Sequence, residues 1–354
     1  MEAYIRGIGN ISPQPTFETE AFLEEIREYR TARLQSVEPN YKNYIQPLQL
    51  RRMGRLLKMG VTAAGMCLHD AGIEKPDAII TATGLGMPEE TEKFLNSMLD
   101  NGEKLLTPTA FMQSTHNTVG AHIAVMLNCN NYNLTYVHGP VSFENALLDS
   151  LMRLAEKPSE KVLLGGIEEI TDLHFIMTDS VGFWKKGEIS NLELFKDKRP
   201  GTIAGEGASF FMLTREENPG NYARISGLST SFNPGNQDIA LDLVQEFLTS
   251  KKIGIHDIDL LLLGMNGDPA SDAIYQPVVD HFNGLCTACF KHLCGEHYLA
   301  PSFAMWLAAK IIKKQIIPAA VLLNDQPKYG RVNNILIYNH HKNIYHSLIL
   351  LSSC

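Results

Sequence analysis

The sequence predicts an α/β fold, because segments with the spacing of amphipathic helices alternate with short apolar segments typical of buried strands. Residues 52–71 carry apolar side chains at helical spacing, and Gly72 follows where a helix would end. Residues 77–83 then have the pattern of a buried strand that leads into the turn at residues 84–86. We therefore expect a sheet with helices on both faces.

The same alternation continues and then starts again after Pro219. We expect further helices at residues 118–127, 142–154, 239–248 and 302–313, and further strands at residues 134–137, 161–164, 258–263 and 319–323. The segment 257–263 leads to Gly264 as the segment 77–83 leads to Gly84. This order predicts two similar α/β halves, residues 1–217 and 218–354, packed as layers of helix and sheet.

The composition excludes several classes of protein. A chain of 354 residues with 44% apolar and 20% charged residues can bury a large core. The formal net charge of -8 makes nucleic acid an unexpected partner. The first residues lack the features of a signal peptide, and no segment reaches about 18 consecutive apolar residues, so we expect no membrane association. Six cysteines in this length form no disulfide framework, and we expect a cytoplasmic protein.

Five motifs occur in order along most of the chain: Arg51 to Arg55 with Asp70 to Gly72, Gly165 to Glu169, Arg199 to Ala208, Met265 to Pro269, and Lys291 to Glu296. Together they resemble the landmarks of β-ketoacyl synthases, the condensing enzymes of fatty-acid and polyketide assembly. The resemblance implies a thiolase-like fold, in which two similar α/β halves form a layered α-β-α-β-α sandwich.

The resemblance also indicates where the active site of this family would lie. A condensing synthase holds the acyl chain on a cysteine thiolate at a helix N-terminus, and two histidines stabilise the charge that develops on decarboxylation. The equivalent positions here are His138, Asn266, Lys291 and Glu296. No cysteine lies in the turn around His138, and only Lys291 matches by type.

Two of these replacements have different chemical consequences. The amide of Asn266 is able to donate a hydrogen bond to an oxyanion. An ionised Glu296 would oppose an enolate by about 4 kcal/mol for charges ~4 Å apart at an effective dielectric near 20. We expect Glu169, His292 and His297 to support these positions.

Other residues have a functional and a structural interpretation. His138 is either a base oriented by Glu144 or Glu296, or a histidine that fills the vacated site. The segment Ile337 to Lys342, where the family has a glycine-rich loop, contains no glycine. Cysteines and histidines at 286, 289, 292, 294 and 297 suggest zinc, but only one Cys-x-x-Cys pair exists, so we expect structural thiols and no metal. No motif predicts a cofactor.

We therefore predict a non-catalytic subunit that is similar to the chain-length factors, which pair with an active ketosynthase. The segments Ser114 to Thr118, Tyr136 to His138 and Ser142 to Leu147 resemble the synthase-like proteins of bacterial aryl-polyene, flexirubin and dialkylresorcinol pathways. The implied partners are an acyl carrier protein or acyl thioester and an active ketosynthase, or a second copy of the chain. Dimerisation is expected through the apolar segment 134–148.

Two alternatives remain open at this stage. The first is an active acyltransferase or decarboxylase of the same fold that uses Asn266, Lys291 and a residue other than cysteine. The second is a protein that only binds an acyl chain or its carrier.

Overall fold

The computed structural model describes the whole chain except residues 1, 18–20, 235–238 and 325–329. The strands are β1 (Ala3–Ile11), β2 (Ala78–Ala82), β3 (Tyr132–Tyr136), β4 (Val162–Glu168), β5 (Gly207–Thr214), β6 (Ala223–Phe232), β7 (Leu260–Leu263), β8 (Cys286–Cys289), β9 (Asn334–His341) and β10 (Tyr345–Ser352). The α-helices are α1 (Pro47–Leu50), α2 (Arg55–Ala71), α3 (Pro88–Asp100), α4 (Pro108–Gln113), α5 (Thr118–Met126), α6 (Ser142–Glu156), α7 (Asp172–Ser180), α8 (Ile239–Lys251), α9 (Pro269–Asp272), α10 (Gln276–His281), α11 (Lys291–Cys294) and α12 (Ala300–Lys314). Short 3₁₀ helices include η2 (Gly139–Val141), η3 (Asn191–Glu193) and η6 (Ala319–Val321).

The strand order shows the predicted repetition. The described strands form one sheet in the order β3-β2-β4-β5-β1-β6-β10-β9-β7-β8. When the five strands of each half are numbered in chain order and read from the outer edge of the sheet inward, both halves give the order third, second, fourth, fifth, first. In each half the three outer strands are parallel and the next strand is antiparallel to them. The two five-stranded parts join where β1 pairs with β6 at Ala3 to Ile5. The exact division at residue 217 stays a prediction.

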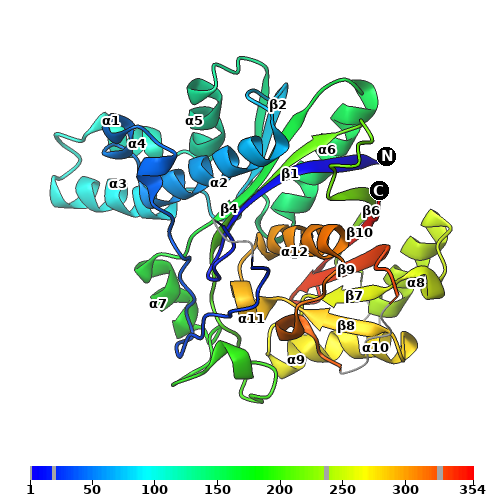
Figure 1. Cartoon of the computed structure of the whole chain (residues 1–354). Helices are drawn as coiled ribbons and strands as arrows, with labels where there is room; N and C mark the ends of the chain where they lie inside the picture. Colours follow the sequence, from blue (N-terminus) through cyan, green and yellow to red (C-terminus); the bar gives the residue numbers. More distant parts are fainter. Residues whose placement is uncertain (1, 18–20, 235–238, 325–329) are drawn as a thin grey trace.

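Helices cover the sheet in layers (Figure 1). The helices α6 and α12 contact each other and lie against strands of both halves. On the outer faces, α2 and α5 pack on the first half, and α8 and α10 belong to the outer core of the second. Side chains alternate accordingly: Leu260 and Leu262 of β7 point into the central core, whereas Leu261 and Leu263 point into the outer core. This arrangement confirms the predicted layers.

Most predicted elements are present, with shifts of a few residues at their ends. The helix α2 ends as expected, because Gly72 has φ 64°, a left-handed conformation that glycine adopts easily. The predicted strand at residues 319–323 is wrong, since Ala319–Val321 is a 3₁₀ helix. The last strands are instead β9 and β10, which form a hairpin.

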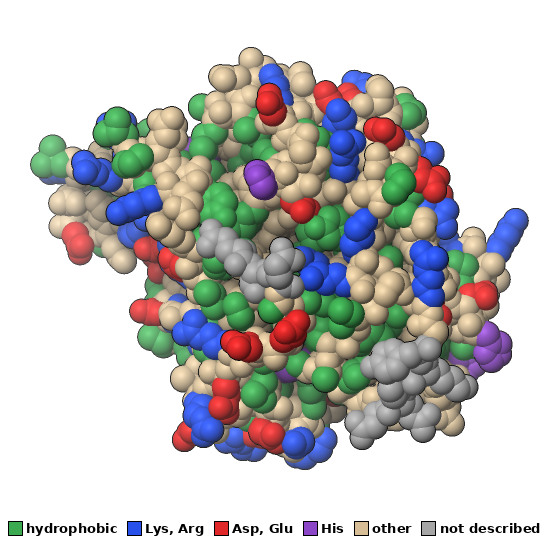
Figure 2. All heavy atoms as spheres, viewed as in Figure 1, with side chains coloured by type: hydrophobic (Ala, Val, Ile, Leu, Met, Phe, Trp, Pro, Cys, Tyr) green, Lys and Arg blue, Asp and Glu red, His purple; other side chains and the backbone are tan. Residues whose placement is uncertain are grey.

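An arm built from α1, α3 and α4 projects from the body (Figure 1). Hydrophobic side chains are visible on its surface (Figure 2), and Leu99 and Leu105 of this region are 80% and 95% exposed. None of the helices in the described residues has the length and apolar character needed to cross a membrane.

Candidate functional site

The candidate site lies where parallel strands of the second half end. Asn266 follows β7, Lys291 follows β8, and His341 is the last residue of β9. Because the carboxyl ends of parallel strands meet at one edge of a sheet, these three side chains reach the same region. Lys291 is the first residue of the helix α11.

Lys291 and Glu296 form a buried ion pair. The Nζ atom of Lys291 lies 2.8 Å from Oε2 and 3.1 Å from Oε1 of Glu296. Lys291 is 1% exposed and Glu296 is 8% exposed. Burial alone would raise the pKa of Glu296, but the charge of Lys291 and hydrogen bonds from Lys291 and Asn266 outweigh it and lower the pKa. Glu296 is therefore ionised, and the charge of Lys291 balances its charge. This corrects the expectation of an uncompensated negative charge at Glu296.

A close approach of two backbones places Glu296 beside Lys291. Gly295 has φ 74°, and a Cβ atom at this position would lie 2.4 Å from the Cα of Gly205. The backbone N–H of Glu296 donates to the carbonyl of Ile203, and the N–H of Gly205 donates to the carbonyl of Glu296. The turn at Gly295 therefore directs the Glu296 side chain back toward Lys291.

Asn266 is held by four hydrogen bonds within the protein. Its Nδ2 donates to Glu296 at 2.9 Å, and its backbone N–H donates to Asp272 at 2.8 Å. Its carbonyl accepts from the hydroxyl of Thr202, and its Oδ1 accepts from the N–H of Asp268. Burial raises the pKa of Asp272 to about 6. One of the two N–H bonds of the predicted oxyanion donor is thus used within the protein.

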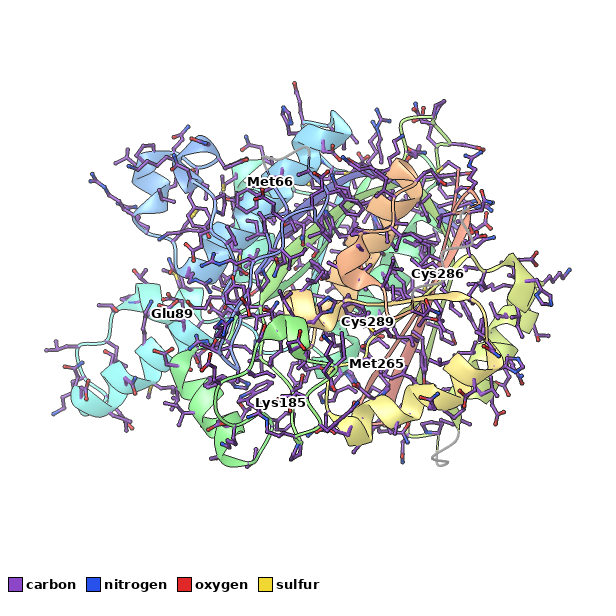
Figure 3. The ribbon with its side chains drawn as sticks, turned by 60° about the horizontal axis from the view of Figure 1, so that its bottom comes forward. Met66, Glu89, Lys185, Met265, Cys286 and Cys289 are labelled. Atoms are coloured by element: carbon purple, nitrogen blue, oxygen red, sulfur yellow. The ribbon has the colours of Figure 1, made fainter. Side chains whose placement is uncertain are left out.

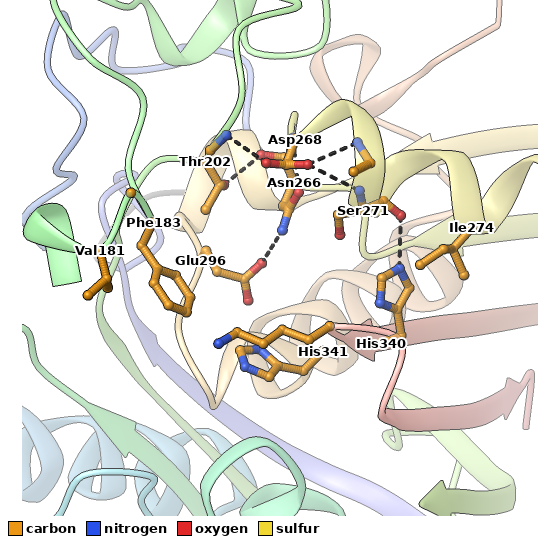
Figure 4. Close-up of a pocket in the computed structure, with 14 residues that line it drawn as sticks. Val181, Phe183, Thr202, Asn266, Asp268, Ser271, Ile274, Glu296, His340 and His341 are labelled. Carbon is orange, nitrogen blue, oxygen red and sulfur yellow. Dashed lines mark hydrogen bonds between the residues drawn. The ribbon is translucent and has the colours of Figure 1, made fainter. Parts of the chain in front are cut away.

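Two cavities lie beside this network, and Figure 4 shows the larger one. The larger cavity has a volume of about 390 Å³ and is lined by Thr202, Asn266, Asp268, Ser271 and His340, among others. The smaller cavity has a volume of about 170 Å³ and is lined by residues that include Leu85, Glu168, Ile170, Trp184, His297 and Tyr298. Both are lined by Phe183, Glu296, His341 and Lys342.

The other predicted site residues have separate locations. His138 is exposed, its ring lies 6.4 Å from that of Tyr345, and it lines neither of these cavities. Glu169 is buried, which raises its pKa to about 7, and accepts a hydrogen bond from the N–H of Glu89. His292 makes a 2.8 Å hydrogen bond with the carbonyl of Ala320. Of the three expected supporting residues, only His297 lines either cavity.

The cysteines do not supply a nucleophile to these cavities. All six are free, and none lines either cavity. Cys286 and Cys289 lie on β8 in the second half (Figure 3). Burial raises the pKa of the Cys289 and Cys294 thiols, which disfavours the reactive thiolate. Among the described residues, no three His, Cys, Asp or Glu side chains are arranged to hold a metal ion.

The hairpin between β9 and β10 takes the place of the expected loop. Residues 337–341 belong to β9, and Lys342 and Asn343 form a tight turn with φ 55° and 54°. The turn presents the Lys342 ammonium over the ring of Phe183, at 4.2 Å from its centroid. Sequence reasoning missed Phe183, Trp184 and His341 as lining residues. For Phe183 and Trp184, the signal was that residues 182–207 lack a clear period, as functional loops often do. His341 lies in the segment Ile337 to Lys342, where the family has a glycine-rich loop.

The chain is similar to known proteins in part of its sequence and in its fold. Residues 27–180 match the family described as beta-ketoacyl synthase, N-terminal domain. This part of the chain is similar to that domain. A search of curated proteins found no match.

The fold of this β-ketoacyl synthase-like protein is similar to several solved structures. The ishigamide ketosynthase/chain length factor matches with a TM-score of 0.83 and 17% identity, over 100% of this chain and 99% of that chain. A β-ketoacyl synthase from Burkholderia phymatum has a TM-score of 0.74 and 16% identity, over 100% and 99%. The ketosynthase ApeO with its chain length factor ApeC from Xenorhabdus doucetiae has a TM-score of 0.74 and 14% identity, over 99% and 98%. These matches confirm the predicted thiolase-like fold.

Proposed function

We propose that the chain is a non-catalytic subunit, similar to a chain length factor, that pairs with an active ketosynthase in fatty-acid or polyketide-type assembly. One observation carries this proposal: the positions that would stabilise a developing negative charge are bonded to one another. Lys291 neutralises Glu296, and Asn266 donates its amide to the same carboxylate. A site whose two charges are already paired, and whose amide already donates to the same carboxylate, has little left to stabilise a transition state.

The absence of a usable nucleophile supports the same function. The helix α6 begins at Ser142, which follows the turn where a condensing enzyme would hold its cysteine. The Ser142 hydroxyl is buried, donates to the carbonyl of Gly139 and accepts from the N–H of His138. This hydroxyl therefore stabilises the turn. Solved structures of the same fold include ketosynthase and chain length factor pairs.

We further propose that the partner binds along β3 and α6. The strand β3 is an outer edge of the sheet and pairs with β2 alone among the described strands. Leu134 and Val137 near this edge are 40% and 41% exposed, and Leu148 and Met152 of α6 are 39% and 46% exposed. An exposed edge strand flanked by apolar side chains favours pairing with another chain. The partner is a cysteine-bearing ketosynthase, and the ligand that reaches the pair is an acyl thioester on a carrier protein.

A cytoplasmic location is part of the proposal. Five of the six free cysteines are buried, and free thiols persist in a reducing compartment.

The test combines the chain with a cognate ketosynthase and malonyl-carrier protein. We expect carbon dioxide release only when both proteins are present, and release that is lost when Leu134→Lys prevents their association. Ile316→Lys, at a 54% exposed position that follows α12 and belongs to neither β3 nor α6, is the matched control and should leave the pair intact. Carbon dioxide release by this chain alone would instead support the acyltransferase or decarboxylase.

A further inference from the structure

The motif Gly165 to Glu169 ends in two buried carboxyl groups that the proposed function does not use. Glu168 is the last residue of β4 and Glu169 follows it, and the two residues are 1% and 3% exposed. They contact the connector between β2 and α3, which we define as residues 83–89. This connector leads from the sheet into the arm (Figure 1). The two carboxyl groups therefore lie at the root of the arm.

The oxygens of these carboxyl groups accept hydrogen bonds from the backbone of the connector. The N–H of Gly84 donates to Oε2 of Glu168 at 2.8 Å, and the N–H of Leu85 donates to Oε1 at 3.2 Å. The N–H of Glu89, in the first turn of α3 (Figure 3), donates to Glu169 at 3.4 Å. The connector is thus fixed to the end of β4 by side chains whose hydrogen-bonding capacity changes with protonation.

The connector encloses Glu168 closely. A Cβ atom at Gly84 would lie 2.6 Å from Oε2 of Glu168 and 2.3 Å from Cδ2 of Tyr298. The hydroxyl of Thr83 lies 3.3 Å from Oε1 of Glu168 and accepts from the N–H of Gly86. A protonated Glu168 is able to donate to this hydroxyl, so the enclosed position suits a neutral carboxyl group. Hydration of an ionised Glu168 requires the connector to move away.

The surroundings of both carboxyl groups oppose ionisation. Burial is the largest cause, and it raises the pKa of Glu168 to about 8 and that of Glu169 to about 7. The charges of Glu89 and Glu206 also raise the pKa of Glu169. The nearby cation Arg55 is already paired with Glu206. Both carboxyl groups therefore exchange a proton near neutral pH.

The rings beside Glu168 do not titrate in the same range. The other titratable or charged side chains of the cavity that Glu168 lines are His174, Glu296, His297, Tyr298, His341 and Lys342. Burial lowers the pKa of these three histidines, to about 4 for His297 and His341, and it raises the pKa of Tyr298. Glu296 is already ionised and paired with Lys291. A change of charge at this root near neutral pH is thus assigned to Glu168 and Glu169.

We propose that Glu168 and Glu169 form a pH-sensitive latch at the root of the arm. With their protons they hold the connector against the end of β4. Loss of a proton to solvent leaves a buried carboxylate, which becomes hydrated only when the connector moves away. The latch goes beyond the proposed function and needs no partner. A chain that does not pair with a ketosynthase would still have the latch, and a chain without the latch would leave the pairing proposal standing.

The latch gives the opening of the connector a defined pH dependence. The closed state keeps the protons up to about pH 7 or 8, whereas a hydrated glutamate in the open state has an ordinary pKa of about 4.3. The open fraction therefore rises with pH between these values. Amide hydrogen exchange of the full chain, corrected for the intrinsic rate, measures this opening at Gly84, Leu85 and Glu89. We expect an increase of about tenfold between pH 6 and pH 7 for one carboxyl group.

Three variants test the assignment. Glu168→Gln, which cannot ionise, should keep Gly84 and Leu85 protected at every pH and remove most of the increase. Glu168→Ala, which removes both acceptors, should let these amides exchange rapidly at all pH values. Glu144→Gln is the matched control, because burial also raises the pKa of Glu144 to about 7 but this residue belongs to α6. The control should keep the pH dependence of the wild type.

Several outcomes would overturn the latch. One is corrected exchange of Gly84 and Leu85 that stays constant between pH 6 and pH 8 in the wild type. Another is an increase that persists in Glu168→Gln or disappears in Glu144→Gln. Loss of protection by the same factor in α12, outside the arm, would assign the increase to global unfolding and also refute the latch. If Glu168→Ala does not fold, the wild type and Glu168→Gln still decide the question.

Discussion

Two buried glutamates, one in each half of the chain, differ in whether a neighbouring side chain forms hydrogen bonds with the carboxylate. Glu296 has a lysine and an asparagine within hydrogen-bond distance, and its pKa is lowered. Glu144, in the first turn of α6, is fully buried, and neither carboxyl oxygen has a hydrogen-bond partner among the described residues. Burial raises the pKa of Glu144 to about 7, and Ser347 and the charge of Lys291 only partly offset it.

The difference shows how burial alone fails to determine the charge of a carboxylate. A partner at 2.8 Å keeps Glu296 ionised, whereas Glu144 holds a proton over much of the neutral range. The two glutamates belong to the regions where a condensing enzyme would hold its histidine and its nucleophile. In this chain one region is neutralised by an ion pair, and the other contains a carboxyl that is costly to ionise.

The largest expected effect follows from removing the cation of the ion pair. Lys291→Met should lower the free energy of unfolding at pH 7 by about 3–5 kcal/mol, because it leaves a buried charge without a partner. The loss should be smaller at pH 5, where Glu296 becomes protonated in the variant. Chemical denaturation checks this. The double variant Lys291→Met/Glu296→Gln should recover part of the stability, and a single variant as stable as wild type would contradict the comparison.

A second effect concerns the unpaired carboxyl. Between about pH 4.5 and pH 7 the folded protein keeps the Glu144 proton that the unfolded chain has released, so the free energy of unfolding falls as pH rises. Glu144→Gln should remove this slope. The variant should be more stable than wild type by about 3 kcal/mol at pH 8 and nearly equal to it near pH 4.5. Unfolding curves for the two proteins that differ by a constant amount at all pH values would refute the assignment.

The smallest effect tests the neutral partner of Glu296. Asn266→Ala should cost about 2 kcal/mol, because it removes a hydrogen bond to a charged group. The control Asn133→Ala removes an amide that donates to the neutral carbonyl of Gly120 and should cost about 1 kcal/mol or less. Equal losses in the two variants would indicate that the charge of Glu296 does not strengthen its bond to Asn266.

The sequence carried most of the information on elements and motif positions. The helix α2 with its end at Gly72 and the strands β2, β4 and β7 follow from hydrophobic spacing and glycine positions. The segment 319–323 was mistaken for a strand because a short apolar run has no periodicity that separates a strand from a buried turn. The hairpin around Lys342 was missed for a related reason, since its turn contains no glycine.

The sequence by itself determined the α/β order, the family resemblance and the absence of a cysteine beside the turn at His138, because these depend on residue identity and local spacing. Only the tertiary structure decided that Glu296 is neutralised by Lys291, that the Asn266 amide donates to Glu296, and that His297 lines one of the two cavities while His138 lines neither. These outcomes depend on where separate strand ends meet and on the close contact of Gly205 with Gly295. Distances of a few ångströms between segments far apart in the chain set the charges, and no local pattern encodes them.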